Sequence, residues 1–332
     1  MGYEKAFHDQ NLKAHTFLVT GGAGFIGSHI VEYLLQHGAG KVTVLDNLST
    51  GNIKNIEPFL NDSRFEFVEG DIRDFDLVTS LVKRSTYVSH QAALGSVPRS
   101  IKDPLTTNDV NITGFLNVLT AVKNSPVTRR LVYAASSSTY GDSTELPKRE
   151  EKIGKPLSPY AVTKYVNELY ANVFGQLYDT DSIGLRYFNV FGPRQNPRGP
   201  YAAVIPLFIS AVIRDENPLV HGDGLQTRDF TYVENAVQAN IRAFFAGPQA
   251  KNQVFNIAAG QRTSLLDLLG LLEKISGRPL HPVHTDPRPG DVRDSLADIS
   301  KAQKLLGYRD IVPLEEGLKH TYDYFKRNAN DI

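Results

Sequence analysis

The feature that most constrains the fold is a glycine-rich turn between a short apolar strand and an amphipathic helix. Residues 16–20 are typical of a buried strand, and residues 25–36 carry apolar side chains at helical spacing. Between them, glycine recurs at every third position, at Gly21, Gly24 and Gly27. Such glycines permit the tight bend, the approach of a pyrophosphate and the close packing of helix on strand. We therefore expect a dinucleotide here, with its phosphates at the helix N-terminus.

Strands and helices continue to alternate through the first half of the chain, which predicts a parallel sheet covered on both faces. Further strands are predicted at 41–45, 65–68, 87–90, 130–135 and 183–187, and helices at 74–83, 105–123 and 158–178. After Asn189, prolines and glycines cluster at 192–206 and 281–290. The expected fold is a Rossmann-type, doubly wound α/β sheet with a smaller C-terminal α/β substrate domain. We assign residues 1–181 to the NAD-binding domain and 182–332 mainly to the substrate domain, with a soft boundary that the chain can cross.

Composition excludes several classes of function. Lys and Arg together number 36, as do Asp and Glu, so no net charge attracts nucleic acid or a membrane surface. The absence of cysteine excludes disulfides, thiolate catalysis and cysteine-ligated metals. No apolar run approaches the ~18 residues of a membrane helix, and the first 13 residues carry no signal-peptide core. We expect a soluble, cytoplasmic protein with a small-molecule substrate and no metal.

An acidic residue at the end of the second predicted strand indicates which dinucleotide binds. Asp46 follows the glycine turn by about 20 residues, where a carboxylate suits the two ribose hydroxyls of NAD and repels the 2′-phosphate of NADP. No arginine follows Asp46 immediately. Asp71 and Ile72 follow the third strand, where they could reach the adenine, although an aspartate at such a place can equally well form a turn.

A candidate catalytic group combines a tyrosine, a lysine and a serine. Tyr160 and Lys164 are four residues apart and share one face of a predicted helix. Ser136 follows a buried strand at the sheet edge where open α/β folds bind ligands. A nearby ammonium favours the tyrosine phenolate, which otherwise forms only near pH ~10. The spacing alone is common on solvated helices, so the prediction depends on the order in which the glycine turn, Asp46, Ser136 and this pair occur.

These motifs together resemble the extended short-chain dehydrogenase family, over about residues 16–307. The resemblance is carried by 20–28 (TGGAGFIGS), 90–93 (HQAA), 133–141 (YAASSSTYG), 158–164 (SPYAVTK), 186–194 (RYFNVFGPR), 226–230 (QTRDF) and 288–291 (RPGD). Within the nucleotide-sugar branch, residues 93–100 and 154–170 look most like UDP-N-acetylglucosamine 4-epimerases of bacterial surface-polysaccharide pathways. The resemblance implies an isomerase that holds NAD tightly and recycles it.

The resemblance also implies residue roles. Ser136 and Tyr160 would act at the 4-hydroxyl of the hexose, and Lys164 would bind the nicotinamide ribose. Further cofactor contacts would come from Phe25, Ile26, Asn47, Ser49, Thr50, Gly51, Gln91, Ala92, Ala93, Asn111, Tyr187 and Val190. Contacts to the UDP-sugar would come from Ser137, Ser138, Asn189, Val204, Arg228, Arg288, Asp291 and Ser295. Family members pair the helices at 105–123 and 158–178 into a four-helix bundle, which implies a homodimer, although both helices could instead pack within one chain.

The residues at a few positions narrow the choice of reaction and substrate. Relatives that are 4,6-dehydratases place an Asp-Glu pair where this chain has Ser137 and Ser138, and UDP-glucuronate decarboxylases tend to place a glutamate at Ser138. Ser295 lies where the family gates the sugar pocket, and a small residue leaves room for an N-acetyl group. We therefore expect interconversion of UDP-GlcNAc and UDP-GalNAc, possible also for UDP-Glc and UDP-Gal, with Tyr160 as base.

Three alternatives remain open. UDP-glucose or UDP-glucuronate can be the principal substrate, and Gly95 replaces a lysine that glucose-specific members tend to carry. A non-catalytic NAD-binding sensor is the third reading, disfavoured because Tyr160 and Lys164 are both present.

Overall fold

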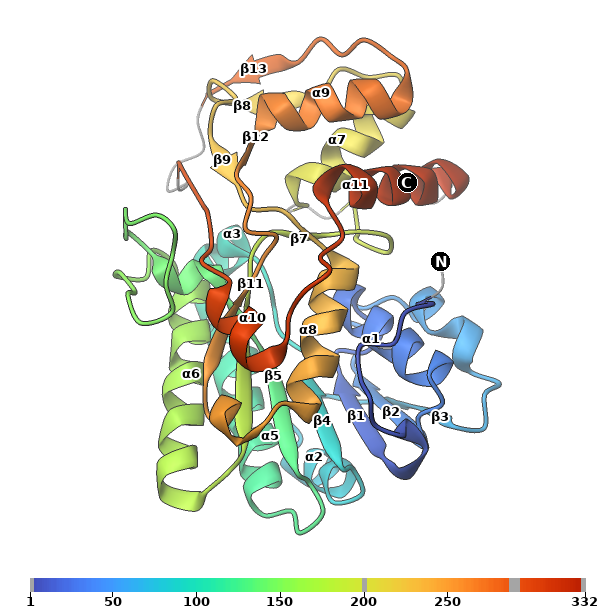
Figure 1. Cartoon of the computed structure of the whole chain (residues 1–332), viewed down its shortest axis with the longest axis vertical. Helices are drawn as coiled ribbons and strands as arrows, with labels where there is room; N and C mark the ends of the chain where they lie inside the picture. Colours follow the sequence, from blue (N-terminus) through green and yellow to red (C-terminus); the bar gives the residue numbers. More distant parts are fainter. Residues whose placement is uncertain (1–2, 199–201, 287–292, 330–332) are drawn as a thin grey trace.

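The computed structural model describes residues 3–198, 202–286 and 293–329, and its centre is a seven-stranded parallel sheet (Figure 1). The strand order is β11-β6-β5-β4-β1-β2-β3, so the chain winds outward in both directions from β1 and β4. The sheet strands are β1 (Thr16–Thr20), β2 (Lys41–Asp46), β3 (Phe65–Glu69), β4 (Tyr87–His90), β5 (Arg130–Ser136), β6 (Ser182–Tyr187) and β11 (Val254–Ile257).

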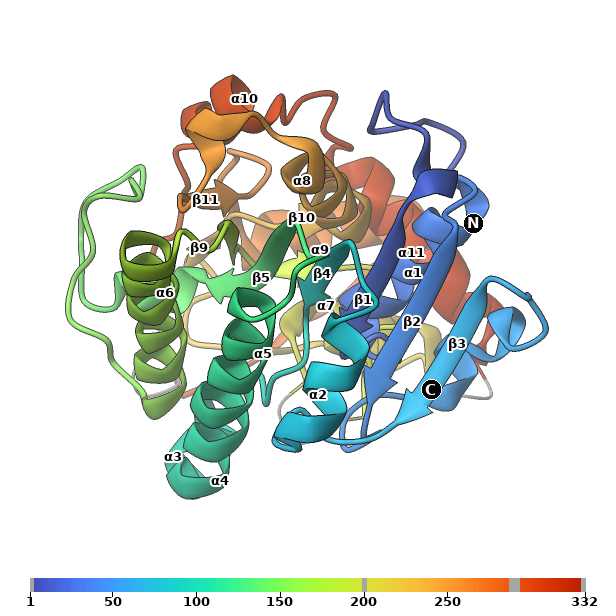
Figure 2. The same ribbon diagram turned by 90° about the horizontal axis from the view of Figure 1, so that it is seen from below.

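Helices cover both faces of this sheet. One face carries α1 (Phe25–Gln36) and α8 (Val233–Phe245), and the other carries α2 (Phe75–Val82), α5 (Gly114–Lys123) and α6 (Pro159–Tyr178), as Figure 2 shows. Both faces of the central strands are therefore buried, and every residue of β4 and all but the first residue of β1 are buried. The expected doubly wound α/β class is confirmed.

The predicted strands and helices of the first half agree with the observed ones to within one or two residues at each end, except in one segment. The helix predicted at 105–123 is divided into α4 (Pro104–Asn108), a π-helical turn (Asp109–Thr113) and α5. A π turn inserts one extra residue per turn, and such turns often occur at functional sites. Here it brings the buried Asn111 side chain against the loop that follows β4.

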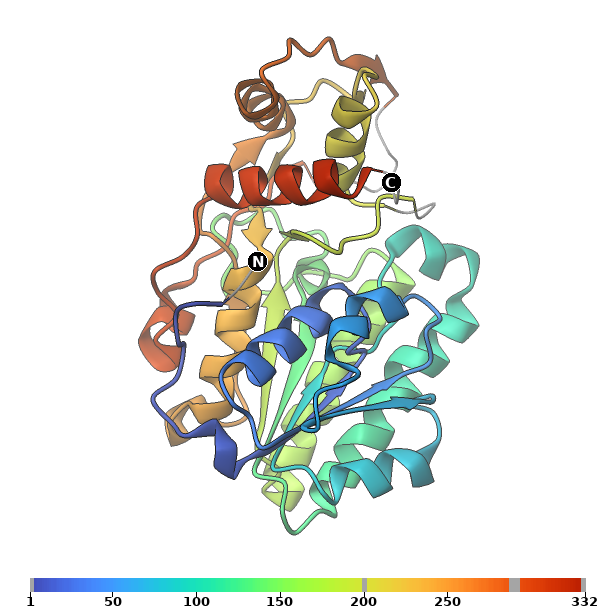
Figure 3. The same ribbon diagram turned by 90° about the vertical axis from the view of Figure 1, so that its right-hand side faces the viewer.

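A smaller part lies above the carboxyl ends of the strands (Figure 3). It contains α7 (Val204–Ile213), α9 (Leu265–Ser276) and α11 (Leu314–Arg327), which enclose a separate apolar core around Phe208, Leu268 and Leu318. Short strand pairs complete it: β7 (Val190–Phe191) with β10 (Thr231–Tyr232), β8 (Leu219–His221) with β13 (Val283–Thr285), and β9 (Thr227–Arg228) with β12 (Thr263–Ser264).

The chain crosses between the two parts more than once. Residues after 181 supply β6, α8 and β11, together with α10 (Ser300–Leu306), to the large part. A single boundary at residue 181 therefore does not divide the sheet from the smaller part. None of the helices in the described ranges is both long and apolar enough to cross a membrane.

Candidate functional site

A large cavity of about 640 Å³ runs along the carboxyl ends of the strands. The glycine turn lines one region of this cavity, and Ser136, Tyr160 and Lys164 line another. Its volume lies in the range usual for cofactor and ligand sites. Most predicted cofactor positions line it, namely Gly21, Gly24, Phe25, Ile26, Gly27, Asp46, Asn47, Ser49, Thr50, Ile72, Gln91, Ala92, Ala93, Tyr187 and Val190.

The glycine turn leaves no room for side chains at two positions. A Cβ on Gly27 would lie 2.2 Å from the carbonyl oxygen of Gly21, so the start of α1 packs directly on the turn. Gly21 itself has a φ of +70°, and a Cβ there would lie 2.6 Å from the backbone nitrogen of Ala92. The turn can adopt this shape only with glycine, and it directs the N-terminus of α1 into the cavity.

Asp46 is fixed beside the glycine turn. One carboxylate oxygen accepts the backbone N–H of Ala23 at 3.0 Å, and the other accepts that of Leu48 at 2.9 Å. The side chain is nearly buried, and burial raises its pKa while these backbone hydrogen bonds lower it. A carboxylate offers about four lone-pair sites, and these backbone hydrogen bonds do not fill them, so Asp46 can still accept a ribose hydroxyl. A hydrogen-bond acceptor at this position fits the adenosine ribose of NAD.

The catalytic candidates meet where β5 ends and α6 begins. Lys164 is buried, and its ammonium donates to the carbonyl oxygen of Ala134 on β5 at 2.9 Å. Ser158 caps α6 by accepting the N–H of Ala161, which fixes the first turn that carries Tyr160. The helix therefore presents Tyr160 and Lys164 to the cavity from one face, as their spacing predicted.

The hydroxyl group of Ser136 can donate a hydrogen bond to Tyr160. Its hydroxyl oxygen accepts the N–H of Ser138 at 3.2 Å and the hydroxyl of Ser138 at 2.9 Å. A serine hydroxyl has two lone pairs and one proton, so the proton remains for another acceptor. Burial raises the pKa of Tyr160, and a hydrogen bond with Ser136 lowers it. Ser136 is thus arranged to stabilise a phenolate at Tyr160.

The environment of Lys164 places its titration near neutral pH. Burial lowers the pKa of Lys164 to about 8, and the negative charge of Glu168 one helical turn away opposes that shift. A buried lysine with such a pKa in a cavity is typical of a functional site rather than of a structural one.

Several predicted residues lie behind the cavity wall instead of in it. Asn111 accepts the N–H of Leu94 at 2.8 Å and donates to the carbonyl oxygen of Leu94 and to Thr163, so it joins the π turn to the loop after β4 and to α6. Gly51 packs against the Asp46 carboxylate. Ser137 does not line either cavity, and Ser138 holds Ser136.

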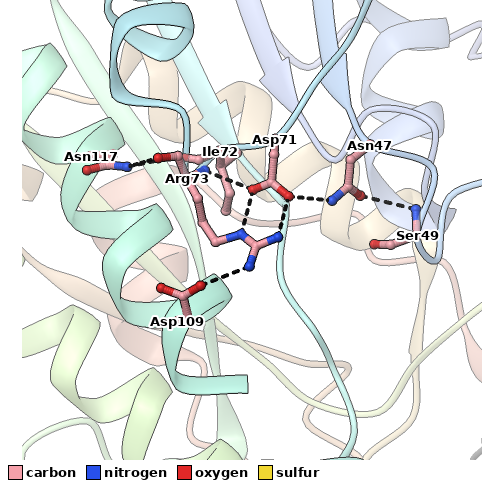
Figure 4. Close-up of polar contacts among 7 residues, drawn as sticks. All are labelled: Asn47, Ser49, Asp71, Ile72, Arg73, Asp109 and Asn117. Carbon is pink, nitrogen blue, oxygen red and sulfur yellow. Dashed lines mark hydrogen bonds and ion pairs between the residues drawn. The ribbon is translucent and has the colours of Figure 1, made fainter. Parts of the chain in front are cut away.

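Asp71 is not among the residues that line the cavity. Its carboxylate pairs with Arg73 at 2.8 Å and accepts the side-chain amide of Asn47 at 2.8 Å, as Figure 4 shows. The arginine holds the pKa of Asp71 at about 2. Its neighbour Ile72 lines the cavity. A contact between Asp71 and adenine stays a prediction.

A second, smaller cavity of about 220 Å³ lies in the smaller part and shares Asn189 and Val190 with the large one. Of the predicted substrate residues, Asn189, Val204 and Arg228 line it. Asn189 has a φ of +37° and donates to the carbonyl oxygen of Asp229 at 3.2 Å, which turns the chain between the two cavities.

Further polar residues line these cavities at positions that the sequence patterns did not indicate. Gln226 and His221 line the smaller one, and Arg99, Gln195 and Asn196 line the larger one. Gln226 belongs to the motif at 226–230 and could have been found there. His221 ends the short strand β8 and Arg99 lies on the short helix α3 (Val97–Lys102), while Gln195 and Asn196 lie on a loop. None of these four stands in a pattern that marks it as a cavity residue.

Two predicted positions lie outside the described residues, and a third, Ser295, is not among the residues that line either cavity. Arg288 and Asp291 fall in the range 287–292, which the structure does not describe. Ser295 donates its backbone N–H to the carbonyl oxygen of Thr227 at 3.2 Å and does not line either cavity. No group of three or more metal-ligating side chains occurs among the residues described.

Comparison with known proteins agrees with this geometry. The model of the NAD dependent epimerase/dehydratase family matches residues 17–258. The chain belongs to this family. NAD is accordingly its cofactor, and the extended short-chain dehydrogenase resemblance seen in the sequence is confirmed.

Individual family members are similar over nearly their whole length. A putative UDP-glucose 4-epimerase of Methanocaldococcus jannaschii is 38% identical, over 94% of this chain and 98% of the relative. The structure of UDP-N-acetylglucosamine 4-epimerase from Methanobrevibacter ruminantium, in complex with UDP-N-acetylmuramic acid, has a TM-score of 0.88 at 38% identity and covers 95% and 99% of the two chains. UDP-glucuronic acid 4-epimerase from Bacillus cereus, in complex with UDP-glucuronic acid and NAD, has a TM-score of 0.87 at 34% identity and covers 94% and 99%.

Proposed function

We infer that the chain is a UDP-sugar 4-epimerase, and we propose UDP-GlcNAc and UDP-GalNAc as its substrate pair. The observation that carries the proposal is that one cavity joins the glycine turn and Asp46 to Ser136, Tyr160 and Lys164. A dinucleotide bound along it would bring its reactive end beside a proton acceptor. The family membership and the similarity to UDP-sugar 4-epimerases support the same reaction.

The chain's own residues supply binding and proton transfer. Asp46 would hold the adenosine ribose of NAD, and the N-terminus of α1 would stabilise its pyrophosphate charge. When bound, NAD accepts a hydride from C4 of the sugar and returns it to the opposite face. Tyr160 would take the proton of the 4-hydroxyl as C4 becomes a carbonyl, and would return it when the carbonyl is reduced.

Ser136 and Lys164 support the charge on Tyr160. The proton of Ser136 stabilises the phenolate through the hydrogen bond that already lowers the Tyr160 pKa. The Lys164 ammonium lies on the same helix face, and its positive charge would favour a negative tyrosine. The hydrogen bond with Ser136 opposes the burial that raises the Tyr160 pKa, and it acts at the atom that must lose a proton.

The smaller cavity would hold the nucleotide end of the substrate. Arg228 presents a guanidinium fork suited to a diphosphate, and Asn189 lies where the two cavities meet. Firm binding of the nucleotide leaves the hexose free to present either face of C4. A Cβ on Gly95, which lines the large cavity, would meet no atom within 4 Å, so this wall has space for a bulky substituent.

The substrate assignment is tested by incubating the purified protein, with no added cofactor, separately with UDP-GlcNAc, UDP-Glc and UDP-glucuronate. The C4 epimers are separated by chromatography. We expect conversion of UDP-GlcNAc to be the fastest. Faster conversion of UDP-Glc or UDP-glucuronate would keep the mechanism and overturn the substrate pair. UDP-glucose is the second candidate, because the Methanocaldococcus relative carries that name.

Ser295 provides a sharper test of the N-acetyl preference. We propose that Ser295→Tyr lowers kcat/KM for UDP-GlcNAc more than for UDP-Glc, because an aromatic side chain would crowd the acetamido group. Ser276→Tyr, at the end of α9, is the control and should leave the ratio unchanged. An unchanged ratio in Ser295→Tyr would remove Ser295 from the specificity argument.

We also propose that two copies of the chain associate through α6 and the helices beside it. Apolar side chains form an exposed stripe along α6, on the face opposite Lys164 and Glu168, and continue onto α3 (Val97–Lys102) and α4. The stripe consists of Ile101, Leu105, Val162, Leu169, Tyr170, Val173 and Leu177. Leu105 is 82% exposed and Leu177 67% exposed, which is unusual for leucine on a packed helix and typical of a protein interface.

A further inference from the structure

Three polar side chains close a ring of hydrogen bonds between α8 and the carboxyl ends of two sheet strands. The amide nitrogen of Asn240 donates to the hydroxyl of Tyr187 at 2.7 Å, and that hydroxyl donates to the amide oxygen of Gln91 at 3.2 Å. The amide nitrogen of Gln91 donates to the amide oxygen of Asn240 at 3.1 Å and completes the hydrogen-bond ring. Ser89 reinforces it, because its hydroxyl accepts from Gln91 at 3.0 Å and donates to Asn240 at 3.3 Å.

One backbone carbonyl fixes the direction of each bond in the hydrogen-bond ring. The carbonyl oxygen of Ala236 lies 2.8 Å from the Asn240 amide and can only accept, so the nitrogen of Asn240 must face it. The oxygen of Asn240 then faces Gln91, which must present its nitrogen there and its oxygen to Tyr187. Because the hydroxyl of Tyr187 already accepts from Asn240, its own proton goes to Gln91. Burial raises the pKa of Tyr187 to about 12, so this proton is retained at neutral pH.

The hydrogen-bond ring connects the interior of α8 to the large cavity near its catalytic candidates. Gln91 and Tyr187 line the cavity, whereas Asn240 is completely buried and is not among the lining residues. Tyr187 ends β6 and pairs in register with Ser136 on β5, and Gln91 follows β4, which is the neighbour of β5 on its other side. The ring therefore lies at the Ser136 end of the cavity, and β1 separates it from Asp46 at the end of β2.

The wall formed by Gln91 and Tyr187 can accept hydrogen bonds but has no proton left to donate. Both N–H groups of the Gln91 amide are used, one by Ser89 and one by Asn240. The proton of Tyr187 is used by Gln91. The remaining capacity is a lone pair on each of the two oxygens. Without Asn240, the Gln91 amide could turn over and the Tyr187 hydroxyl could rotate, so the same wall would offer donors as well.

A second asparagine on α8 shows what a purely structural role looks like. Asn235 is also almost completely buried, and its amide donates to the carbonyl oxygen of Val312 at 3.0 Å and accepts the N–H of Val312 at 2.9 Å. These bonds join α8 to the segment before α11, and neither residue lines a cavity. Asn240 instead contacts two side chains that line the cavity, at a helix-interior position where asparagine is a poor helix former.

We propose that Asn240 is a positioning residue for the nicotinamide half of NAD, which acts by holding Gln91 and Tyr187 as hydrogen-bond acceptors in the cavity wall. Asn240 itself makes no contact with the cofactor. The proposal rests on the proposed function only in placing the reactive end of NAD beside Ser136 and Tyr160, and it does not depend on which sugar is converted. Its tests are read without any sugar, so their failure would leave the proposed reaction intact.

The first test compares Asn240→Leu with Asn235→Leu. Both changes replace a buried amide on α8 by an apolar side chain of similar size, but only Asn240→Leu opens the hydrogen-bond ring. Release of NAD from the holoprotein is followed by ultrafiltration at timed intervals, together with the thermal midpoint. We expect Asn240→Leu to release NAD about five to ten times faster than wild type, and Asn235→Leu to stay within about twofold. Wild-type release by Asn240→Leu, or equal acceleration in both variants, would overturn the proposal.

A smaller substitution keeps this comparison available if leucine prevents folding. Asn240→Ala and Asn235→Ala then form the matched pair, with the same expected difference in NAD release and the same contradicting results. Alanine opens the hydrogen-bond ring without placing a branched side chain against Tyr187.

A second test asks whether Asn240 acts through Gln91 and Tyr187. The parent is the double variant Gln91→Leu/Tyr187→Phe, in which both partners of Asn240 at the cavity wall have lost their polar groups. We expect the addition of Asn240→Leu to leave the rate of NAD release within about twofold of this parent, because interactions within one network are not additive. A further acceleration of about five to ten times would mean that Asn240 acts by another route, and it would overturn the proposal.

The emission spectrum of bound NADH separates positioning from a general effect on stability. The cofactor is reduced chemically in the holoprotein, and the variants are compared with wild type. We expect the emission maximum in Asn240→Leu to move toward that of free NADH, since the nicotinamide is held less firmly, and Asn235→Leu to keep the wild-type spectrum. A wild-type spectrum in Asn240→Leu would contradict the positioning role of Asn240.

Discussion

Arg186 on β6 and Glu168 on α6 form a bidentate ion pair, at 2.9 and 2.7 Å, in which both side chains are almost completely buried. Arg186 also donates to the carbonyl oxygen of Glu150 at 3.0 Å and lies over the ring of Tyr140. Glu168 is one helical turn beyond Lys164, on the buried face of α6. The pair therefore holds the catalytic helix against the sheet.

Removal of one partner should destabilise the protein strongly. We expect Glu168→Gln and Arg186→Met each to lower the free energy of unfolding by about 3–5 kcal/mol, because each leaves a buried group without its partner. The double variant Glu168→Leu/Arg186→Met should be less destabilised than either single variant. Urea denaturation measures all three, and a double variant whose losses simply add would show that the pair is not coupled.

The low pKa of Lys164 gives a pH dependence of stability. Its pKa falls from 10.5 to about 8 on folding, so between pH 8 and 10.5 the unfolded chain binds more protons and stability rises with pH. Below pH 8 the buried ammonium opposes folding. We expect Lys164→Met to stabilise the apoprotein at pH 7 by about 1–3 kcal/mol and to lose the rise between pH 8 and 10.5. Thermal unfolding across this range checks both effects.

Substitution of alanine for two helical glycines should change the stability of the protein in opposite directions. Gly27→Ala would place a Cβ 2.2 Å from the carbonyl oxygen of Gly21, so we expect a loss of about 1–3 kcal/mol of stability and loss of bound NAD. Gly270, in the interior of α9, has open space around it, and Gly270→Ala should stabilise the protein by about 0.5–1 kcal/mol. Thermal midpoints and NAD content distinguish the two variants.

The exposed stripe on α4 and α6 predicts how the dimer can be broken. Leu105→Glu and Leu177→Glu should each produce a monomer in light scattering, since a charge would be buried in the interface. Leu60→Glu is the control, because Leu60 is 47% exposed and lies beyond β2 at a distance from the stripe. A wild-type chain that is already monomeric would contradict the proposed assembly.

Local pattern was sufficient to predict the first half of the fold. The strand at 16–20 and the helix at 25–36 were predicted with their observed bounds, because the glycine turn fixes where one ends and the other begins. The π turn was missed, because it is produced by what Asn111 contacts and not by the periodicity of its own segment. The place of β11 in the sheet was missed as well, because four residues at the far edge carry no sign of their distant partner β6.

The sequence predicted which residues line the cavity where a motif fixes the backbone. It predicted them less well where two side chains compete for the same hydrogen-bond partner. Gly21, Asp46, Tyr160 and Lys164 line the cavity as expected. Asp71 does not, because Arg73 two residues later occupies its carboxylate, a competition that the strand pattern cannot reveal.

Removal of the hydroxyl oxygen of Tyr160 tests most directly whether this residue is the base of the reaction. Tyr160→Phe keeps the ring in the cavity but cannot accept the proton of the 4-hydroxyl. Bound NAD is measured by absorbance after denaturation, and the C4 epimers of UDP-GlcNAc are separated by chromatography. We predict wild-type NAD content and a rate of epimer formation lower by about 100- to 10,000-fold. Formation of the epimer at the wild-type rate, with NAD bound, would contradict Tyr160 as the base.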